Sequence, residues 1–454
     1  MNSLFVIGGR VIDPANSIDG PADLLIVDGV VEAVEAPGQL RAPEGVPTID
    51  ATGCWVIPGL IDPHVHLRDP GFPEKETIAS GLRAAAAGGF TAVAAMANTS
   101  PVNDTPSVAK YMLDRAREVK AARLIPVSAV TRGLQGIELV DFAAMAEAGA
   151  RLFSDDGIPI DNEAVLSQAF DAIGQLGFAI SLHEEDRHLS NEGAVNAGEI
   201  SKRLGVKGYL TSAEARRIRR DLAIAIGSEA PAHIAHLSCS ESIELVRHAR
   251  KNGAQVTSEV TPHHFWLDEN AILEWGPNAK MNPPLRAHSD VDAIRAAMAD
   301  GTIDMIATDH APHDPASKQV EHLAGCFPLN ANASLPDDSA NAFMRAANGV
   351  IGLETSLGLA IGLVHKEIIL ASRLVELMSV NPARLLRLEE GALSRRLAAN
   401  VTIIDPNFEW TVQPAKFLSK SRNTPFAGMR LRGKAVLTIL QGEIMYDGRG
   451  ASRI

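Results

Sequence analysis

Two histidines separated by one residue, His64 and His66, are the first residues whose types and spacing could do chemistry. Side chains at positions i and i+2 of an extended segment point to the same side, so both imidazoles would share one face. With carboxylates supplied from elsewhere, they would begin a divalent metal site. Arg68 adds a fixed positive charge two residues further on. A His-x-His pair alone fits equally well with one buried and one surface histidine, so the rest of the chain must decide.

Short apolar runs alternate with amphipathic segments between about residues 55 and 390. The runs that predict strands cover residues 56–61, 90–96, 124–130, 150–153, 178–182, 233–237, 255–260 and 303–307. The segments that predict helices include residues 74–87, 107–120, 162–176, 212–226, 241–251 and 291–299, and Thr211 and Glu214 have the spacing of a capping box. Eight strands alternating with helices predict an α/β fold, a closed (β/α)8 barrel of the TIM type.

Polar residues fall at the carboxyl ends of these predicted strands, where barrel enzymes build their sites. They are His64 and His66 after the first strand, Asp155 and Asp156 after the fourth, His183 after the fifth, His236 after the sixth and Asp309 after the eighth. Singly, each such histidine is more often a hydrogen-bonded rim residue, but the set predicts a metal site. Nitrogen and carboxylate ligands suit zinc, manganese or cobalt. Six ligands exceed the needs of one tetrahedral zinc with an open position, so one or two zinc ions are considered, with a bridging carboxylate for two.

Both ends of the chain read as short strands between turns rich in Gly, Pro and Asp. They most economically form one small β-sandwich domain, residues 1–55 with 395–454, beside a barrel domain of residues 56–394. Two separate small sheets are the alternative. Residues 315–342 are rich in Asn, Ala, Ser, Pro and Asp and lack periodicity. A loop this long is usually either functional or disordered.

Composition limits the classes of partner. The 454 residues carry a formal net charge of −13, which argues against nucleic acid or an anionic membrane as a partner. An anionic substrate would therefore need local charges such as Arg68. The three cysteines lack Cys-x-x-Cys spacing, as expected for reduced thiols in the cytoplasm. No run approaches the roughly 18 apolar residues of a membrane span, so a soluble cytoplasmic protein is expected.

Eight motifs together resemble the amidohydrolase superfamily, and specifically the bacterial dihydroorotases of the longer, first class. The resemblance covers nearly the whole chain. The motifs are HVHLRDPG (64–71), MANT (96–99), FSDDG (153–157), HE (183–184), AHLS (235–238), KMNPPLR (280–286), ATDHAPH (307–313) and GLET (352–355). The resemblance implies a metal centre held by His64, His66, Asp156, His183, His236 and Asp309.

Hydantoinases and allantoinases, which are relatives of this family, use a carboxylated lysine after strand four to bridge two metals. This chain has no lysine between Lys120 and Lys202, and Asp156 would bridge in its place. The resemblance also implies a set of substrate-binding residues: His66, Arg68, Asn98, Asn282, His313, Asn348 and Gly349. From the residues alone, Asn98 and Asn282 could equally be turn residues before prolines.

The sequence departs from the family pattern in two places. Ala97 stands where proline is common. About twenty extra residues precede Asn348, and the family has phenylalanine at that position, which puts the carry-over to Asn348 and Gly349 in doubt. The extra residues could be a lid, a contact with another subunit or an unstructured excursion.

The implied reaction is the reversible hydrolysis of the cyclic amide of dihydroorotate to N-carbamoyl-aspartate, with ring closure in pyrimidine (UMP) synthesis. A bound metal lowers the pKa of water toward about 7. Asp309 would act as general base and then as general acid, or be a plain metal ligand. Arg68 would hold the substrate carboxylate with a paired hydrogen-bonding fork.

Two other functions remain open. One is a cyclic amidohydrolase of the hydantoinase or allantoinase type. The other is a non-catalytic paralogue that scaffolds aspartate transcarbamoylase, although such a protein should have lost ligands that are all present here. The expected partner is a small anionic substrate, and association with copies of the chain or with aspartate transcarbamoylase is left open.

Overall fold

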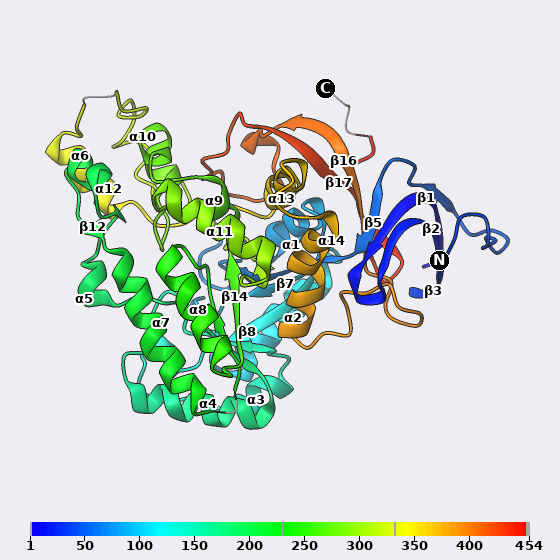
Figure 1. The fold of residues 1–454 in the computed structure, drawn as a ribbon, viewed down its shortest axis with the longest axis horizontal. Helices are drawn as coiled ribbons and strands as arrows, with labels where there is room; N and C mark the ends of the chain where they lie inside the picture. The colour runs from blue at the N-terminus through cyan, green and yellow to red at the C-terminus, as the bar shows by residue number, and fades with distance from the viewer. Residues whose placement is uncertain (1, 229, 331–332, 451–454) are drawn as a thin grey trace.

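The computed structural model describes residues 2–228, 230–330 and 333–450. Its centre is a parallel sheet of eight strands in the order β15-β14-β13-β10-β9-β8-β7-β6 (Figure 1). The strands are β6 (Leu60–Val65), β7 (Phe90–Ala95), β8 (Arg123–Ser128), β9 (Leu152–Phe153), β10 (Ala179–Leu182), β13 (Ala232–Ile234), β14 (Val256–Val260) and β15 (Met305–Ile306). A parallel bridge between Val65 and His310 links the first strand to the segment after the last. The predicted (β/α)8 barrel is therefore confirmed.

Successive residues of a barrel strand pack into different cores, as the two-residue period of a strand requires. On β7, Ala92 and Ala94 join a cluster that gathers side chains from six barrel strands inside the ring. Val93 and Ala95 instead join the larger cluster between the sheet and the helices. Since both faces are buried, these strands read as continuous apolar runs.

All six predicted helices are present, with ends shifted by a few residues. The helices are α1 (Ile78–Ala87), α2 (Pro106–Val119), α3 (Phe142–Glu147), α4 (Glu163–Leu176), α5 (Arg187–Ser190), α6 (Glu199–Leu204), α7 (Thr211–Ile226), α8 (Ser240–Lys251), α9 (Pro262–Trp266), α10 (Ala271–Trp275), α11 (His288–Asp300), α12 (Asp337–Arg345), α13 (Ser356–His365), α14 (Ala371–Val375) and α15 (Asn381–Leu385). The predicted capping box on α7 is wrong, because Thr211 lies inside the helix and Glu214 is buried, accepting from the backbone N–H of Ser238 at 3.0 Å.

Strands from the two ends of the chain form one mixed eight-stranded sheet beside the barrel (Figure 1). They are β1 (Leu4–Asp13), β2 (Ile18–Val27), β3 (Val30–Glu35), β4 (Thr48–Asp50), β5 (Trp55–Pro58), β16 (Val401–Thr411), β17 (Arg430–Leu440) and β18 (Glu443–Asp447). Strand β5 joins the two ends, since it pairs with β1 and with β16. A buried apolar cluster is built from both termini.

The first predicted barrel strand, residues 56–61, is wrong as a unit. The chain leaves the terminal sheet after Pro58 and enters the barrel at Leu60. Between them, Gly59 lies so close to Thr91 that an added Cβ would come within 2.2 Å of its Oγ1. The turn signal Pro58-Gly59 lies inside the run, and reading across it joined two halves that belong to different sheets. As a result, His64 lies on β6 rather than after the strand.

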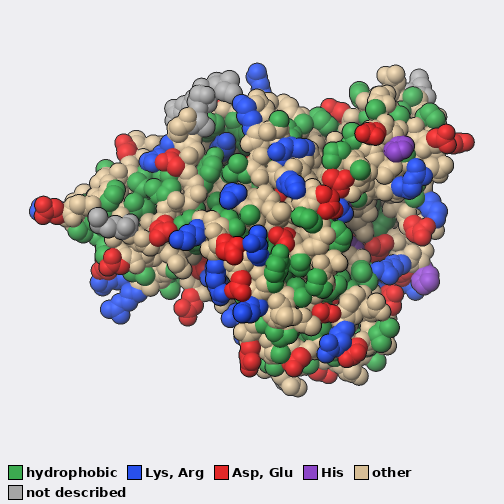
Figure 2. Space-filling model, turned by 180° about the vertical axis from the view of Figure 1, so that it is seen from behind, with side chains coloured by type: hydrophobic (Ala, Val, Ile, Leu, Met, Phe, Trp, Pro, Cys, Tyr) green, Lys and Arg blue, Asp and Glu red, His purple; other side chains and the backbone are tan. Residues whose placement is uncertain are grey.

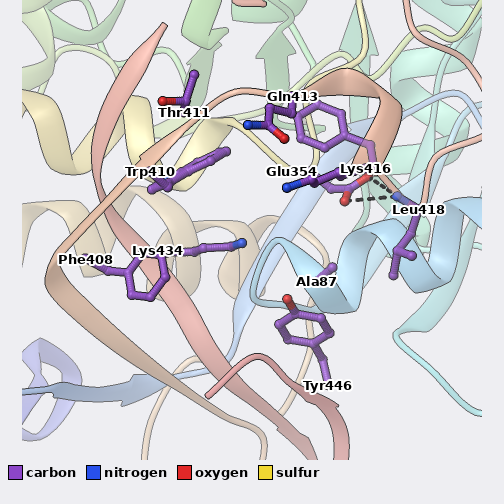
Figure 3. A pocket seen from close by; sticks show the side chains of 11 residues that line it. Ala87, Glu354, Phe408, Trp410, Thr411, Gln413, Lys416, Leu418, Lys434 and Tyr446 are labelled. Carbon is purple, nitrogen blue, oxygen red and sulfur yellow. Dashed lines mark hydrogen bonds between the residues drawn. The ribbon is translucent and has the colours of Figure 1, made fainter. Parts of the chain in front are cut away.

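The terminal sheet contacts the barrel around a cavity of about 330 Å³ (Figure 3). Its lining includes Trp410 of β16, Lys434 of β17, Tyr446 of β18 and Glu354, which precedes α13. The Lys434 ammonium lies 5.1 Å from the ring centre of Trp410. The carboxylate of Glu354 accepts from the backbone N–H of Leu418 at 2.8 Å. Ser419 then donates to Glu76, at the barrel mouth, at 2.5 Å. These contacts bring a C-terminal segment onto the barrel beside Glu76.

Within the aperiodic stretch 315–342, turns run through residues 315–326 and α12 begins at Asp337. Residues 331–332 of this stretch lie outside the described residues. No helix among the residues that the structure describes is both long and apolar enough to cross a membrane.

Candidate metal centre and substrate pocket

Asp156 lies at the centre of a cluster of buried imidazoles. Its Oδ1 atom is 3.5 Å from Nε2 of His64 and 3.7 Å from Nδ1 of His183. The same oxygen is 3.7 Å from Nε2 of His236, and Oδ2 is 3.5 Å from Nε2 of His66. Two potential metal-binding groups share Asp156, one with His64 and His66 and one with His183 and His236, each with its ligand atoms within 4.8 Å of one another.

Asp309 closes the cluster from the other side of the ring. Its Oδ1 is 3.0 Å from Nε2 of His66 and 3.7 Å from Nε2 of His64. Burial alone would raise the pKa of Asp309, but its hydrogen bond with His66 and the nearby imidazoles lower it. Asp309 and His236 both have positive φ angles, 44° and 33°. Such backbone strain in non-glycine residues gathers at functional sites.

The donor set fits a divalent metal. Nε2 of His64 is buried and has no hydrogen-bond partner among the described residues. A buried nitrogen without a partner calls for an explanation, and a bound ion is one of the usual ones. Here the nitrogen lies beside two carboxylates, those of Asp156 and Asp309, so a cation between them would satisfy all three groups.

The two adjacent aspartates have different surroundings. Asp155 accepts from the backbone N–H groups of Val130 at 2.7 Å and Thr131 at 3.1 Å. Burial raises the pKa of Asp155 to about 6. For Asp156 burial acts the same way, but the charge of His64 and the surrounding imidazoles lower its pKa well below the usual value. Asp155 therefore holds the backbone at Val130 and Thr131 in place, while Asp156 faces the imidazoles.

Arg68 and His313 lie together beside the metal cluster. Nη2 of Arg68 is 3.3 Å from Nε2 of His313, and its Nε donates to the carbonyl of Pro312 at 3.3 Å. Burial and the charge of Arg68 lower the pKa of His313 to about 2, so its ring is neutral. The half-buried guanidinium faces a neutral imidazole and forms no ion pair within 4.0 Å among the described residues, although the charges of Asp309 and Asp156 act on it, so it can accept an anionic ligand.

Asn98 and Asn282 also lie at this mouth, each against a histidine. Oδ1 of Asn98 is 2.9 Å from Nδ1 of His66. Nδ2 of Asn282 donates to Glu185 at 3.0 Å and lies 3.4 Å from Nε2 of His183. Oδ1 of Asn282 is buried and has no partner among the described residues. Asn98 therefore orients an imidazole, whereas Asn282 retains a free acceptor.

The last two predicted substrate residues differ from each other. Gly349 has a φ angle of 125°, and a Cβ added to it would come within 2.6 Å of the Ala311 Cβ and 3.4 Å of the His313 ring. Its backbone N–H donates to Lys280 O at 2.9 Å. The side chain of Asn348 is exposed. The structure thus places Gly349 against Ala311 and His313 and leaves the Asn348 side chain exposed.

Comparison with known proteins places the chain in a family. Residues 53–242 match the family model described as Dihydro-orotase-like. The chain is 45% identical over 445 residues to a protein from Citrifermentans bemidjiense named Dihydroorotase, covering 98% of this chain and 100% of that one. It is 44% identical over 440 residues to the Dihydroorotase of Desulforapulum autotrophicum, covering 97% and 98%. The chain belongs to the dihydroorotase family.

A solved structure of lower sequence identity has the same fold as this chain. The L-hydantoinase of Arthrobacter aurescens superposes with a TM-score of 0.85 at 24% identity, covering 99% of this chain and 97% of that one. This likeness concerns the fold.

Sequence reasoning missed Glu259, which lies on β14 inside a predicted strand. Its Oε1 is 2.7 Å from Nδ1 of His64, and its Oε2 is 3.0 Å from Nε2 of His233. Burial would raise the pKa of Glu259, but the two histidines lower it to about 2. A carboxylate on the far nitrogen of a ligand histidine fixes its tautomer and orientation. The available signal was an acidic residue within a buried strand.

Asn423 is the second missed residue, and it comes from the C-terminal segment. Its Nδ2 donates to the backbone carbonyls of Ala311 and Gly349, both at 3.0 Å, and its Oδ1 accepts from the backbone N–H of His313 at 3.0 Å. One buried amide therefore joins the backbone around Ala311 and His313 to that at Gly349. In the sequence it precedes Thr424-Pro425 and reads only as a turn residue.

Proposed function

We propose that this protein is a metal-dependent dihydroorotase that reversibly hydrolyses the cyclic amide of dihydroorotate to N-carbamoyl-aspartate. The observation that carries the proposal is the cluster around Asp156, in a chain 45% identical over nearly its full length to a protein named Dihydroorotase. Ring closure, the reverse direction, is the step that serves pyrimidine synthesis.

We propose zinc as the metal, in one or two ions per chain. The residues that would hold it are His64, His66, Asp156, His183, His236 and Asp309. Imidazole and carboxylate ligands without thiolates support zinc, with manganese and cobalt as substitutes. When bound, the metal would act as a Lewis acid and lower the pKa of water toward about 7.

Asp309 is proposed as the group that moves the proton. Its pKa is lowered, so the carboxylate is ionised at neutral pH and can accept a proton from the attacking water. The same oxygen can then return the proton to the ring nitrogen as the amide bond breaks. Its position on the rim next to His66 supports this role.

Arg68 is proposed to hold the substrate carboxylate, because its guanidinium is half-buried beside the metal cluster and faces neutral His313. The free acceptor of Asn282 suits a ring N–H of the substrate. Asn98 would act mainly through His66, and Gly349 would let the backbone approach the ring. Together these residues would orient the carbonyl for attack.

The nearest rival is a cyclic amidohydrolase of the hydantoinase or allantoinase type. The test is turnover of dihydroorotate, hydantoin and allantoin by the same purified sample. Because the carboxylate would pair with Arg68, kcat/KM for dihydroorotate should exceed the others by at least about tenfold. Arg68→Met should remove most of that preference. A wild-type preference for hydantoin or allantoin would overturn the proposal.

A non-catalytic role scaffolding aspartate transcarbamoylase is disfavoured, since all six ligand residues are present. Association with that enzyme, or with copies of this chain, is a separate proposal for light scattering to decide. Acidic and basic side chains are interspersed on the face drawn in Figure 2. We also propose a cytoplasmic location, which the three cysteines without Cys-x-x-Cys spacing support.

A further inference from the structure

Lys318 lies in the stretch that the family pattern leaves unexplained, yet its side chain is 1% exposed. Its Nζ donates to Pro277 O at 2.8 Å, Lys280 O at 3.2 Å and Ala347 O at 2.8 Å. Three carbonyl acceptors match the three N–H bonds of an ammonium, whereas a neutral amine has two. Burying such a group is costly without a counter-charge, and its hydrogen-bond partners among the described residues are all backbone carbonyls.

The carbonyls that Lys318 binds belong to the two loops of the proposed substrate pocket. Lys280 lies two residues before Asn282, and Ala347 lies two residues before Gly349. The same loops are joined directly by the hydrogen bond from the Gly349 N–H to Lys280 O at 2.9 Å. The ammonium therefore occupies the crossing of the two loops and sets their separation.

The charge of Lys318 also reaches the pocket. Burial and the positive charges of Lys280 and Arg68 lower the pKa of Lys318 well below its usual value, whereas its three carbonyl acceptors favour the ammonium form. Arg68 and Lys318 both help to lower the pKa of His313. These mutual effects place three cationic groups on the side where the substrate carboxylate would bind, and an anion there would relieve their repulsion.

We propose that Lys318 is a positioning residue for an anionic substrate, holding the Asn282 and Gly349 loops at a fixed separation with a second positive charge behind Arg68. The inference rests on the proposed dihydroorotase function. It also gives the first part of the extra stretch a role: residues 314–318 deliver a buried cation to the pocket wall rather than forming a free excursion.

The test compares Lys318→Met with wild type, using dihydroorotate. Methionine keeps the length of the side chain and removes both charge and donors. KM should rise at least about tenfold, kcat should change by less than about threefold, and zinc content should stay the same. Lys434→Met is the matched control, because Lys434 is a partly buried cation outside the pocket, over the Trp410 ring. It should leave KM unchanged.

Lys318→Gln keeps two N–H donors without the charge, so its KM should lie between those of wild type and Lys318→Met. This variant also carries the test if the methionine variant does not fold. An unchanged KM in the folded variants, or a loss of zinc instead, would overturn the inference. Wild-type turnover of dihydroorotate tests the proposed function by itself, so the two failures are distinguishable.

Discussion

Replacing Glu259 by glutamine should weaken metal binding while leaving the fold intact. The carboxylate holds Nδ1 of His64 at 2.7 Å and Nε2 of His233 at 3.0 Å. Glutamine has the same shape, but its NH2 group would meet one imidazole N–H, and the negative charge behind His64 would be lost. Losing such a partner costs about ten- to a hundredfold in metal affinity. This corresponds to about 1.4–2.7 kcal/mol.

The assay is a zinc titration of the metal-free variant against a chromophoric chelator, with thermal unfolding measured in parallel. Glu354→Gln is the matched control. Glu354 is also a partly buried carboxylate, but it accepts from the backbone N–H of Leu418 and contacts none of the proposed metal ligands. The control should keep wild-type affinity. A Glu259→Gln protein with wild-type zinc affinity, or a control that loses as much, would refute the reasoning.

Three further predictions concern proton transfer, the pocket frame and pH. Asp309→Asn should lower kcat by about a hundredfold or more while most of the metal stays bound; near-normal turnover would exclude the proton-transfer role. Asn423→Ala leaves three buried backbone groups without their hydrogen-bond partner, so the free energy of unfolding should fall by roughly 2–4 kcal/mol in urea titrations. The control Asn400→Ala should lower it by less, because it loses one hydrogen bond from the Gln441 backbone N–H. Burial raises the pKa of Glu354 from 4.5 to about 7. Between pH 4.5 and 7 the folded state therefore holds a proton that the unfolded state releases. As the pH rises through this range, the free energy of unfolding of wild type should fall by about 1–2 kcal/mol relative to that of Glu354→Gln, after allowance for solvent screening. Parallel pH profiles of the two proteins would contradict this.

The barrel could be predicted because strands buried on both faces leave apolar runs, and alternating helices leave amphipathic ones. The limits of the first strand could not. Residues 56–61 read as one run across Pro58-Gly59, and the contact of Gly59 with Thr91 shows where the chain passes from one sheet to the other. The α7 capping box failed because Glu214 hydrogen-bonds Ser238, a tertiary contact that local spacing cannot reveal.

The residues at the strand ends could be predicted as a group, since barrel geometry gathers them at one rim. The groups that support them could not. Glu259 lies within a strand, and its partner His64 precedes it by 195 residues in the sequence. Asn423 reads as a turn residue until the C-terminal segment is placed over the barrel mouth. Lys318 gives no local signal, because its three acceptors are all backbone carbonyls.

Metal removal and restoration, followed with dihydroorotate as substrate, tests the central claim most directly. Elemental analysis of the purified protein should find one or two zinc ions per chain. Chelation should abolish hydrolysis, and activity should return in proportion to the zinc added back, with His64→Ala and His236→Ala failing to recover it. A metal-free chain that hydrolyses dihydroorotate at the full rate would contradict the account.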